Sequence, residues 1–217
     1  MAWENSDFPI GIDERMTWMA SVLDEQRWQC NISGKPLTLE NVSLERVDEE
    51  IGYVKFNVVF IRREFQSSVQ WTREAFEEAG RLRHKKDFEP RYQLWKGALN
   101  TMVPGEARTR RSLEQDDLFN RLAKAVHSAK TRTVTKGWAE SEITKEFLVD
   151  QYIMQGGRCH YTNVPLDVNG EWKWSKERLD NSLGYIKDNV VFVIQRVNTF
   201  EQWSRAKADE YWGPLRR

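Results

Sequence analysis

Hydrophobic positions recur along the chain in two series with the same order of elements. Apolar residues at helical spacing predict one helix over residues 14–26 and another over residues 144–155. In each series a turn and a first strand follow, and then the run Asn-Val-Val-Phe, whose branched residues predict a second strand. A further helix is expected to begin near Arg62 and near Arg196. Each series therefore predicts a helix, a β-hairpin and a second helix.

The two series are copies of one sequence unit. Residues 43–60, the first copy, and 175–192, the second copy, share the pattern Ser-x-Glu-Arg-x-Asp-x-x-x-Gly-Tyr-x-Lys-x-Asn-Val-Val-Phe at a constant spacing of 132 residues. An upstream Cys and Pro-Leu pattern, starting at Cys30 and Cys159, repeats at a spacing of 129. The second copy therefore has three extra residues, and they fall around an Asn-Gly pair typical of tight turns. This agreement predicts an internal duplication.

The residues between the copies contain no further example of the pattern. They predict three helices, at 71–83, 92–102 and 113–130, from the spacing of their apolar side chains. We therefore expect an α+β fold. It should consist of two units, residues 1–66 and 143–217, joined by a mostly helical connector over residues 67–142.

Composition narrows the class of protein. The chain has 217 residues, of which 40% are hydrophobic and 30% charged, as expected for a folded protein. No apolar run approaches the ~20 residues of a membrane helix, and the first residues do not resemble a signal peptide, so we expect an intracellular protein without a membrane partner. Two cysteines and three distant histidines do not suggest a disulfide framework or zinc, and each cysteine is interpreted as a small buried side chain.

Charge is distributed unevenly, although the net charge is zero. Residues 1–50 carry eleven acidic and four basic residues, whereas residues 80–96 carry six basic and two acidic ones and residues 106–136 eight and four. A basic middle segment can bind a polyanion locally, and the alternative is a set of solvated helix faces. The candidate phosphate contacts are Arg81, Arg83, Lys85, Lys86, Arg108, Arg110 and Arg111.

The second copy, with Cys-x-x-Thr before it and Val-Asn at 197–198 after it, resembles the His-Me finger superfamily of endonucleases, also called HNH or ββα-metal nucleases. The resemblance covers residues 143–200 well and 14–66 more loosely. It implies two ββα-metal units, each with one divalent cation, Mg²⁺ or Mn²⁺, and a DNA substrate, with RNA left open. It implies that Glu177 and Asn198 bind the metal and that Asn189 braces the loop.

The position at which this superfamily has its water-activating histidine is an arginine in both copies. An arginine cannot act as the base, because its guanidinium remains protonated. Arg178 could instead contact a phosphate or pair with Asp180, and the base could be Asp180, His160 or a metal-bound water. The corresponding residues of the first copy are Glu45, Arg46, Asp48 and Asn57, with Gln66 or Glu64 at the place of Asn198.

Structural roles compete with each of these assignments. The two glutamates could form surface ion pairs, and Asn198 could be an ordinary helix-surface amide. Asn57 and Asn189 could simply cap the loop by binding backbone groups, as asparagine does in turns. We place any active site in the second copy first, because it keeps Asn198 and the longer hairpin.

Three functions remain in competition at this point. The first is a metal-dependent DNA endonuclease, with one active copy or with both copies acting as a pseudo-dimer within one chain. The second is a degenerate His-Me finger protein that binds nucleic acid without cutting it, which the arginine at the histidine position favours. The third is a protein-interaction scaffold, favoured only by the acidic N-terminal region and the ten tryptophans.

Overall fold

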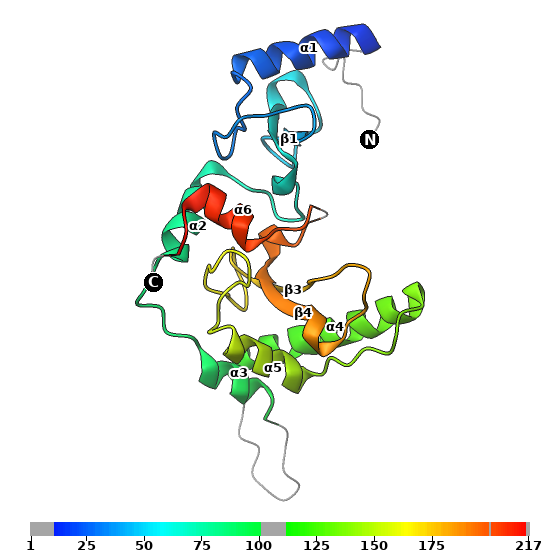
Figure 1. The fold of residues 1–217 in the computed structure, drawn as a ribbon, viewed down its shortest axis with the longest axis vertical. Coiled ribbons are helices and arrows are strands. Elements are labelled where there is room, and N and C mark those ends of the chain that lie inside the picture. Colours follow the sequence, from blue (N-terminus) through cyan, green and yellow to red (C-terminus); the bar gives the residue numbers. More distant parts are fainter. Residues whose placement is uncertain (1–10, 101–111, 200, 216–217) are drawn as a thin grey trace, which may run out of the picture.

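The computed structural model describes residues 11–100, 112–199 and 201–215, and its fold is α+β, as predicted (Figure 1). The described residues form six helices and two antiparallel sheets of two strands each. The helices are α1 (Ile12–Glu25), α2 (Arg73–Arg83), α3 (Tyr92–Ala98), α4 (Leu113–Lys136), α5 (Lys145–Met154) and α6 (Arg205–Trp212). Most lie within a few residues of their predicted positions, because the apolar spacing and the caps were visible in the sequence.

The two hairpins have the same register. Strand β1 (Val42–Arg46) pairs with β2 (Val58–Arg62), and β3 (Trp174–Arg178) pairs with β4 (Val190–Ile194). Arg46 lies opposite Val58 and Arg178 opposite Val190, so each pair in one sheet has its counterpart 132 residues later. The constant spacing in the sequence is therefore a constant spacing in the structure.

The helices that follow the hairpins begin later than predicted. After β2 and β4 the chain forms only short 3₁₀ turns, Arg63–Phe65 and Gln195–Val197, and α2 and α6 start about ten residues further on. Their starts are set by hydroxyl caps: the Thr72 side chain accepts a hydrogen bond from the Ala75 amide, and the Ser204 side chain accepts one from the Lys207 amide, both 3.1 Å.

Thr72 and Ser204 are again 132 residues apart, so the repeat continues beyond residue 66. Helix α2, expected in the connector, is the counterpart of α6. We call α1, β1, β2 and α2 the first half of the molecule, and α5, β3, β4 and α6 the second half. The connector between them consists of α3 and α4.

The two halves contact each other reciprocally. The Trp71 indole N–H donates to the carbonyl of Arg196 at 3.1 Å, and the Trp203 indole N–H donates to the carbonyl of Glu64, also at 3.1 Å. Residues 64 and 196, like the two tryptophans, are counterparts in the repeat. A contact in which each partner uses the same two positions is the mark of twofold symmetry. Helices α2 and α6 lie together at this junction, in the middle of the molecule (Figure 1).

One hydrophobic core runs through both halves and the connector. It contains five of the ten tryptophans, Trp71, Trp95, Trp172, Trp174 and Trp203. The ring of Trp95 from α3 stacks on Tyr152 of α5 with centroids 3.9 Å apart. Cys30 and Cys159 are free and buried in the same core, as predicted. The connector helix α3 is thus packed into the second half.

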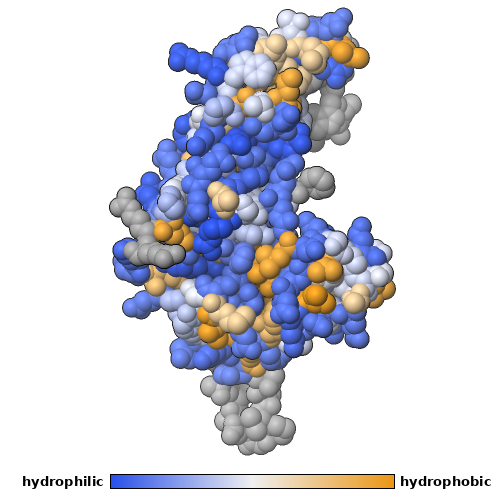
Figure 2. Space-filling view, in the orientation of Figure 1, coloured by the Kyte–Doolittle hydropathy of each residue, from blue (hydrophilic) through white to orange (hydrophobic). Residues whose placement is uncertain are grey.

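The second half is better covered than the first. All five residues of β4 are buried, whereas β2 has two partly exposed ones. Helix α1 forms one end of the molecule, and its Ile12 is 76% exposed; in the space-filling view hydrophobic surface appears on this helix and over the lower half (Figure 2). None of the described helices is long and apolar enough to cross a membrane.

Candidate active site

Glu177 occupies the second-last position of β3 and is only 8% exposed. Its Oε1 accepts a hydrogen bond of 2.9 Å from the Arg178 amide. Burial raises the pKa of this carboxyl above its usual range, although that hydrogen bond and the charges of Arg178 and Arg132 act in the opposite direction. A buried carboxylate of this kind is stabilised by an additional positive charge.

Asn198 lies at the end of the 3₁₀ turn after β4, not on a helix as the resemblance implied. Its Nδ2 donates to the Ser175 hydroxyl at 2.7 Å and to the Lys176 carbonyl at 3.0 Å. These two bonds fix the amide beside β3, the strand that carries Glu177. They use only the nitrogen, so the amide oxygen retains its capacity to accept a hydrogen bond or bind a cation.

In the first half the corresponding carboxylate is already engaged. Gln66 is the counterpart of Asn198, and its Nε2 donates to Glu45 Oε2 at 2.6 Å and to the Leu44 carbonyl at 3.1 Å. Glu45 Oε1 accepts from the Arg46 amide at 2.8 Å, as Glu177 does from its own neighbour. Glutamine has one methylene more than asparagine and reaches the carboxylate, whereas Asn198 bonds to Ser175.

The two halves therefore differ at one ligand position. Within the described residues, Glu177 Oε2 accepts no hydrogen bond, while both oxygens of Glu45 accept one. The placement of any active site in the second copy stays a prediction, and this difference in hydrogen bonding is the observation that favours it.

The loop after each first strand is held by its asparagine, as the capping interpretation predicted. Asn189 Oδ1 accepts from the Asp180 amide at 2.7 Å, and its Nδ2 donates to the carbonyls of Asp180 and Gly184 at 2.9 and 3.0 Å. Asn57 makes the same bonds to Asp48 and Gly52. Both asparagines are buried, so the loop conformation depends on them.

Arg178 also holds this loop. Its guanidinium donates to the carbonyls of Asn181 and Leu183, each at 2.8 Å, and lies over the Trp138 ring at 4.4 Å. Pairing with Asp180 was one of the two alternatives for this arginine, but the Asp180 carboxylate accepts hydrogen bonds from Ser182, which lower its pKa. Arg46 likewise donates to the Glu49 carbonyl.

Each shared tyrosine follows a glycine, a residue type that often supplies an unusual backbone angle. Neither Gly52 nor Gly184 has a positive φ. A Cβ at Gly184 would lie 3.0 Å from the Cβ of Trp138, so this glycine serves close packing of the loop instead.

A tyrosine that the sequence did not suggest stands near Glu177. The Tyr161 hydroxyl accepts a hydrogen bond of 3.1 Å from Gln202, and burial, followed by the charge of Glu177, raises its pKa. The ring of His160 meets the Tyr161 ring edge-on with centroids 5.2 Å apart, and burial and Arg205 lower the histidine's pKa. Gln202 could have been found, because Gln-Trp-Thr/Ser-Arg repeats at residues 70–73 and 202–205.

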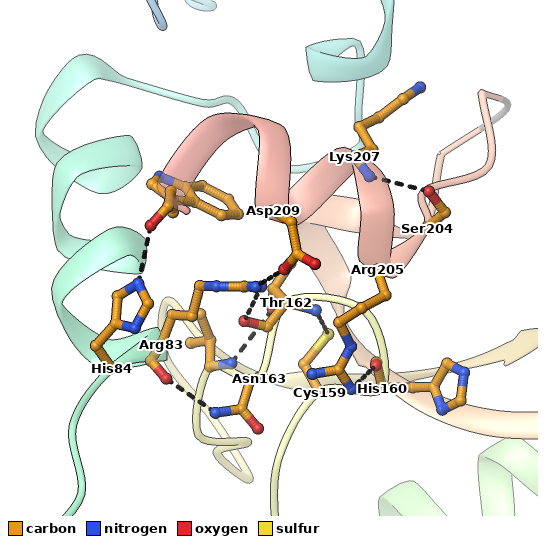
Figure 3. Close-up of polar contacts among 12 residues, drawn as sticks. Arg83, His84, Cys159, His160, Thr162, Asn163, Ser204, Arg205, Lys207 and Asp209 are labelled. Carbon is orange, nitrogen blue, oxygen red and sulfur yellow. Dashed lines mark hydrogen bonds and ion pairs between the residues drawn. The ribbon is translucent and has the colours of Figure 1, made fainter. Parts of the chain in front are cut away.

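The basic segment around residue 84 divides into exposed and buried members. Arg81, Lys85 and Lys86 are exposed, and the two lysines line an open cavity of about 1150 Å³ with Arg158. Arg83 is 1% exposed; its guanidinium donates to the Thr162 carbonyl and pairs with Asp209 of α6 (Figure 3). Its predicted contact with a phosphate is therefore corrected to a structural role. Arg108, Arg110 and Arg111 lie outside the described residues.

The available oxygen donors fit a hard divalent cation better than a soft one. The described residues contain no group of three His, Cys, Asp or Glu side chains that could hold a metal. Glu177 and Asn198 offer a carboxylate and an amide oxygen. Magnesium is commonly held by one or two protein oxygens together with waters and substrate phosphates, so this pair is compatible with it.

The chain is similar to a phage protein over part of its length. No family model and no solved structure matches the chain. A protein of Enterobacteria phage T4, described as the uncharacterized 29.0 kDa protein in the dda-modA intergenic region, is 41% identical over 63 residues. The match covers 26% of this chain and 25% of the phage protein, so the chain spans about a quarter of that relative's length. Its description assigns the phage protein no activity.

Proposed function

We propose that the protein is a metal-dependent DNA endonuclease whose active site is in the second half, at Glu177 and Asn198. One observation carries this proposal: two halves with the same loops and hydrogen bonds differ in that Glu45 is engaged by Gln66 while Glu177 Oε2 accepts no hydrogen bond within the described residues. A buried carboxylate without a second partner suits a bound cation. The resemblance of the second copy to His-Me finger nucleases implies that this cation takes part in phosphodiester hydrolysis.

The cation would be Mg²⁺ or Mn²⁺, with one ion in the active half, held by the Glu177 carboxylate and the Asn198 amide oxygen. Such an ion supplies charge that offsets the negative charge developing on a phosphodiester during hydrolysis. Hydrogen bonds from Asn198 to Ser175 and Lys176 orient the amide before any ligand binds. Preorganisation of this kind reduces the cost of binding.

Arg178 and Asn189 act on the loop and not on the substrate in this proposal. Asn189 binds three backbone groups of the loop, and Arg178 binds two more carbonyls. Together they fix the loop that follows Glu177 and the end of β3. The charges that act on Glu177 are those of Arg178 and Arg132, and the charge of Glu177 in turn acts on Tyr161. None of these is a base at neutral pH, and we expect the attacking water to lose its proton to solvent, which makes cleavage slow.

DNA is the proposed partner, because the exposed Arg81, Lys85 and Lys86 offer positive charge for its backbone. The reciprocal tryptophan contacts give the molecule a twofold arrangement that suits a two-stranded substrate. In this arrangement the first half binds DNA without cutting it. An intracellular location, in a cell that holds the DNA, goes with this function.

The test is cleavage of supercoiled plasmid, branched duplex and single-stranded DNA with Mg²⁺ or Mn²⁺, scored on gels. We expect the wild-type chain to nick DNA and Glu177→Gln to lose this activity, while the matched variant Glu45→Gln retains it. Asn198→Gln should extend the amide to Glu177, as Gln66 extends to Glu45, and abolish cleavage as well. Wild-type protein that cuts none of these substrates, or Glu177→Gln protein that cuts as well as wild type, would contradict the proposal.

Binding of nucleic acid without cleavage is the second candidate. It is favoured by the contacts of the two side chains considered as bases. Asp180 accepts a hydrogen bond from Ser182, and the ring of His160 packs on Tyr161. This function predicts salt-dependent DNA binding that is the same with EDTA and with Mg²⁺. Calorimetric titration with Mn²⁺ distinguishes the two functions. The endonuclease must bind the ion, so the wild-type protein should show a heat of Mn²⁺ binding that Glu177→Gln removes, whereas the binding protein needs no such heat.

A further inference from the structure

A small cavity lies between helix α4 and strand β3, apart from the two oxygen ligands described above. Its volume is about 390 Å³, and its lining includes Arg121, Lys124, Ser128, Trp174, Ser175 and Lys176. Every ionisable side chain in this lining is cationic. No part of the proposed cleavage site explains three positive charges at this place.

Two of these cations, Lys176 and Arg121, have only neutral hydrogen-bond partners in the described residues. Lys176 Nζ donates to the Ser128 hydroxyl at 2.7 Å and lies 5.3 Å from the centre of the Tyr185 ring. Arg121 donates to the Trp174 carbonyl at 3.2 Å and lies over that tryptophan's ring. Asp117 is the acid whose charge acts on Arg121, but the two form no ion pair within 4.0 Å.

Both cations are partly withdrawn from water, and the Nε of Arg121 is buried without a hydrogen-bond partner. Withdrawing a charge from water is unfavourable unless an opposite charge or several hydrogen bonds compensate for it. Serine hydroxyls together with arginine and lysine form a set of donors typical of phosphate contacts. The cavity therefore has the composition of a site for a phosphate group.

Its position links it to Glu177 and Asn198. Ser175 lines the cavity and also accepts the hydrogen bond from Asn198. Lys176 and Glu177 are consecutive on β3, and consecutive strand residues point to opposite faces, so the cavity is next to the proposed metal site without being part of it. A strand of nucleic acid that reaches Glu177 has further phosphates within one or two nucleotides.

The first half does not repeat the residues that β3 contributes to this cavity. The counterpart of Lys176 is Leu44, and the counterpart of Trp174 is Val42. No connector helix stands beside β1 as α4 stands beside β3 (Figure 1). The half in which the carboxylate accepts the extra hydrogen bond is thus also the half with a leucine at the place of Lys176.

We infer that the cavity of Arg121, Ser128 and Lys176 binds a backbone phosphate of the nucleic-acid strand that is engaged at Glu177. This inference rests on the proposed function, because it assigns the second half a polynucleotide substrate. The contact positions the strand and carries no sequence information.

The test uses fluorescence anisotropy of a labelled duplex in EDTA, so that no cleavage occurs, at several salt concentrations. The variants are Lys176→Leu, which takes the residue of the first half, and Arg121→Gln. Each should weaken binding and lower the slope of log K against log salt by about 1, the value for one phosphate contact. The double variant should also lose only about 1, because both side chains contact the same phosphate. The exposed Lys136→Gln on the same helix is the control and should change neither quantity.

Inorganic phosphate separates this inference from the proposed function. We expect phosphate to raise the melting temperature of the wild-type protein and not that of Lys176→Leu, and circular dichroism checks that each variant is folded. If duplex binding and its salt slope are unchanged in both folded variants, the inference is wrong while cleavage at Glu177 can still stand. If phosphate stabilises the wild-type protein but neither duplex nor single-stranded DNA binds to it, the cavity serves a small anion and the inference is wrong, while the cleavage test decides the proposed function.

Discussion

Trp71 and Trp203 stack across the junction of the two halves, with ring centroids 6.2 Å apart and ring planes 21° from parallel. Each also donates its indole hydrogen to a carbonyl of the other half. Two residues at equivalent places in a sequence repeat thus form one symmetric contact. A duplication that places its copies in this way joins within one chain what two identical subunits would otherwise form.

The first prediction concerns this junction. Trp203→Phe keeps most of the ring but removes the donor to the Glu64 carbonyl, which is buried with the tryptophan. Leaving a buried acceptor without a partner costs about 1–3 kcal/mol. We expect the free energy of unfolding in urea to fall by about that amount. Trp71→Phe should have a similar effect, because its contact is the twofold counterpart of the first. A large effect of one variant and none of the other would contradict a symmetric junction.

The second prediction concerns Arg83, which the sequence suggested as a phosphate contact. It is buried beneath α6 and paired with Asp209, so Arg83→Met leaves that acid without its partner (Figure 3). The Asp209 side chain is 36% exposed, so leaving it without its partner costs less than in a fully buried pair, about 1–3 kcal/mol. We expect a comparable loss of stability on thermal or urea unfolding, while Arg81→Met, on the exposed face of the same helix, has little effect.

A double-mutant cycle with Asp209→Leu checks the cause of this loss. If the pair is the reason, the double variant should be more stable than the sum of the two single losses indicates. Strictly additive losses would mean that Arg83 acts through packing alone. DNA affinity corrected for the folded fraction should be unchanged in Arg83→Met, in contrast to Lys85→Gln and Lys86→Gln.

The sequence was sufficient for the repeat, the hairpins and the role of Asn57 and Asn189, because these depend on local patterns that stand in the chain twice. It was not sufficient for Arg83, since the partner of this arginine lies 126 residues away and neighbouring arginines and lysines are exposed. A run of basic residues does not indicate which member turns inward.

The difference between the two candidate sites shows a second limit. The sequence gives Gln66 and Asn198 at the same place, but their contacts depend on whether one more methylene brings the amide to a glutamate on the adjacent strand. The start of α6 shows a third limit. The helix expected near Arg196 begins only at Arg205, because a 3₁₀ turn follows β4 and the Ser204 hydroxyl caps the helix, whereas α2 begins at Arg73, close to its expected range of 71–83.

The third prediction concerns the loop that follows β3. Asn189→Ala removes one acceptor and two donors that bind Asp180 and Gly184, and it leaves these partly or fully buried backbone groups unpaired. At about 1 kcal/mol for each hydrogen bond, the variant should lose ~2–4 kcal/mol of unfolding free energy. Asn57→Ala is the matched variant in the first half and should lose a similar amount. Proteolysis should cut first in the loop that has lost its asparagine, and equal cutting of both loops would count against this local role.

The fourth prediction concerns pH and His160. Burial and the charge of Arg205 lower the pKa of this histidine in the folded protein, whereas an unfolded chain has a histidine pKa of about 6.5. As the pH falls below about 6.5, the unfolded state therefore binds the proton first, and the folded state loses stability. We expect His160→Gln to reduce the difference in urea midpoint between pH 7.5 and pH 5.5. His127→Gln, at an exposed position of α4, is the control and should keep the wild-type difference. If His160→Gln keeps it too, the acid sensitivity arises elsewhere in the molecule and His160 is not its source.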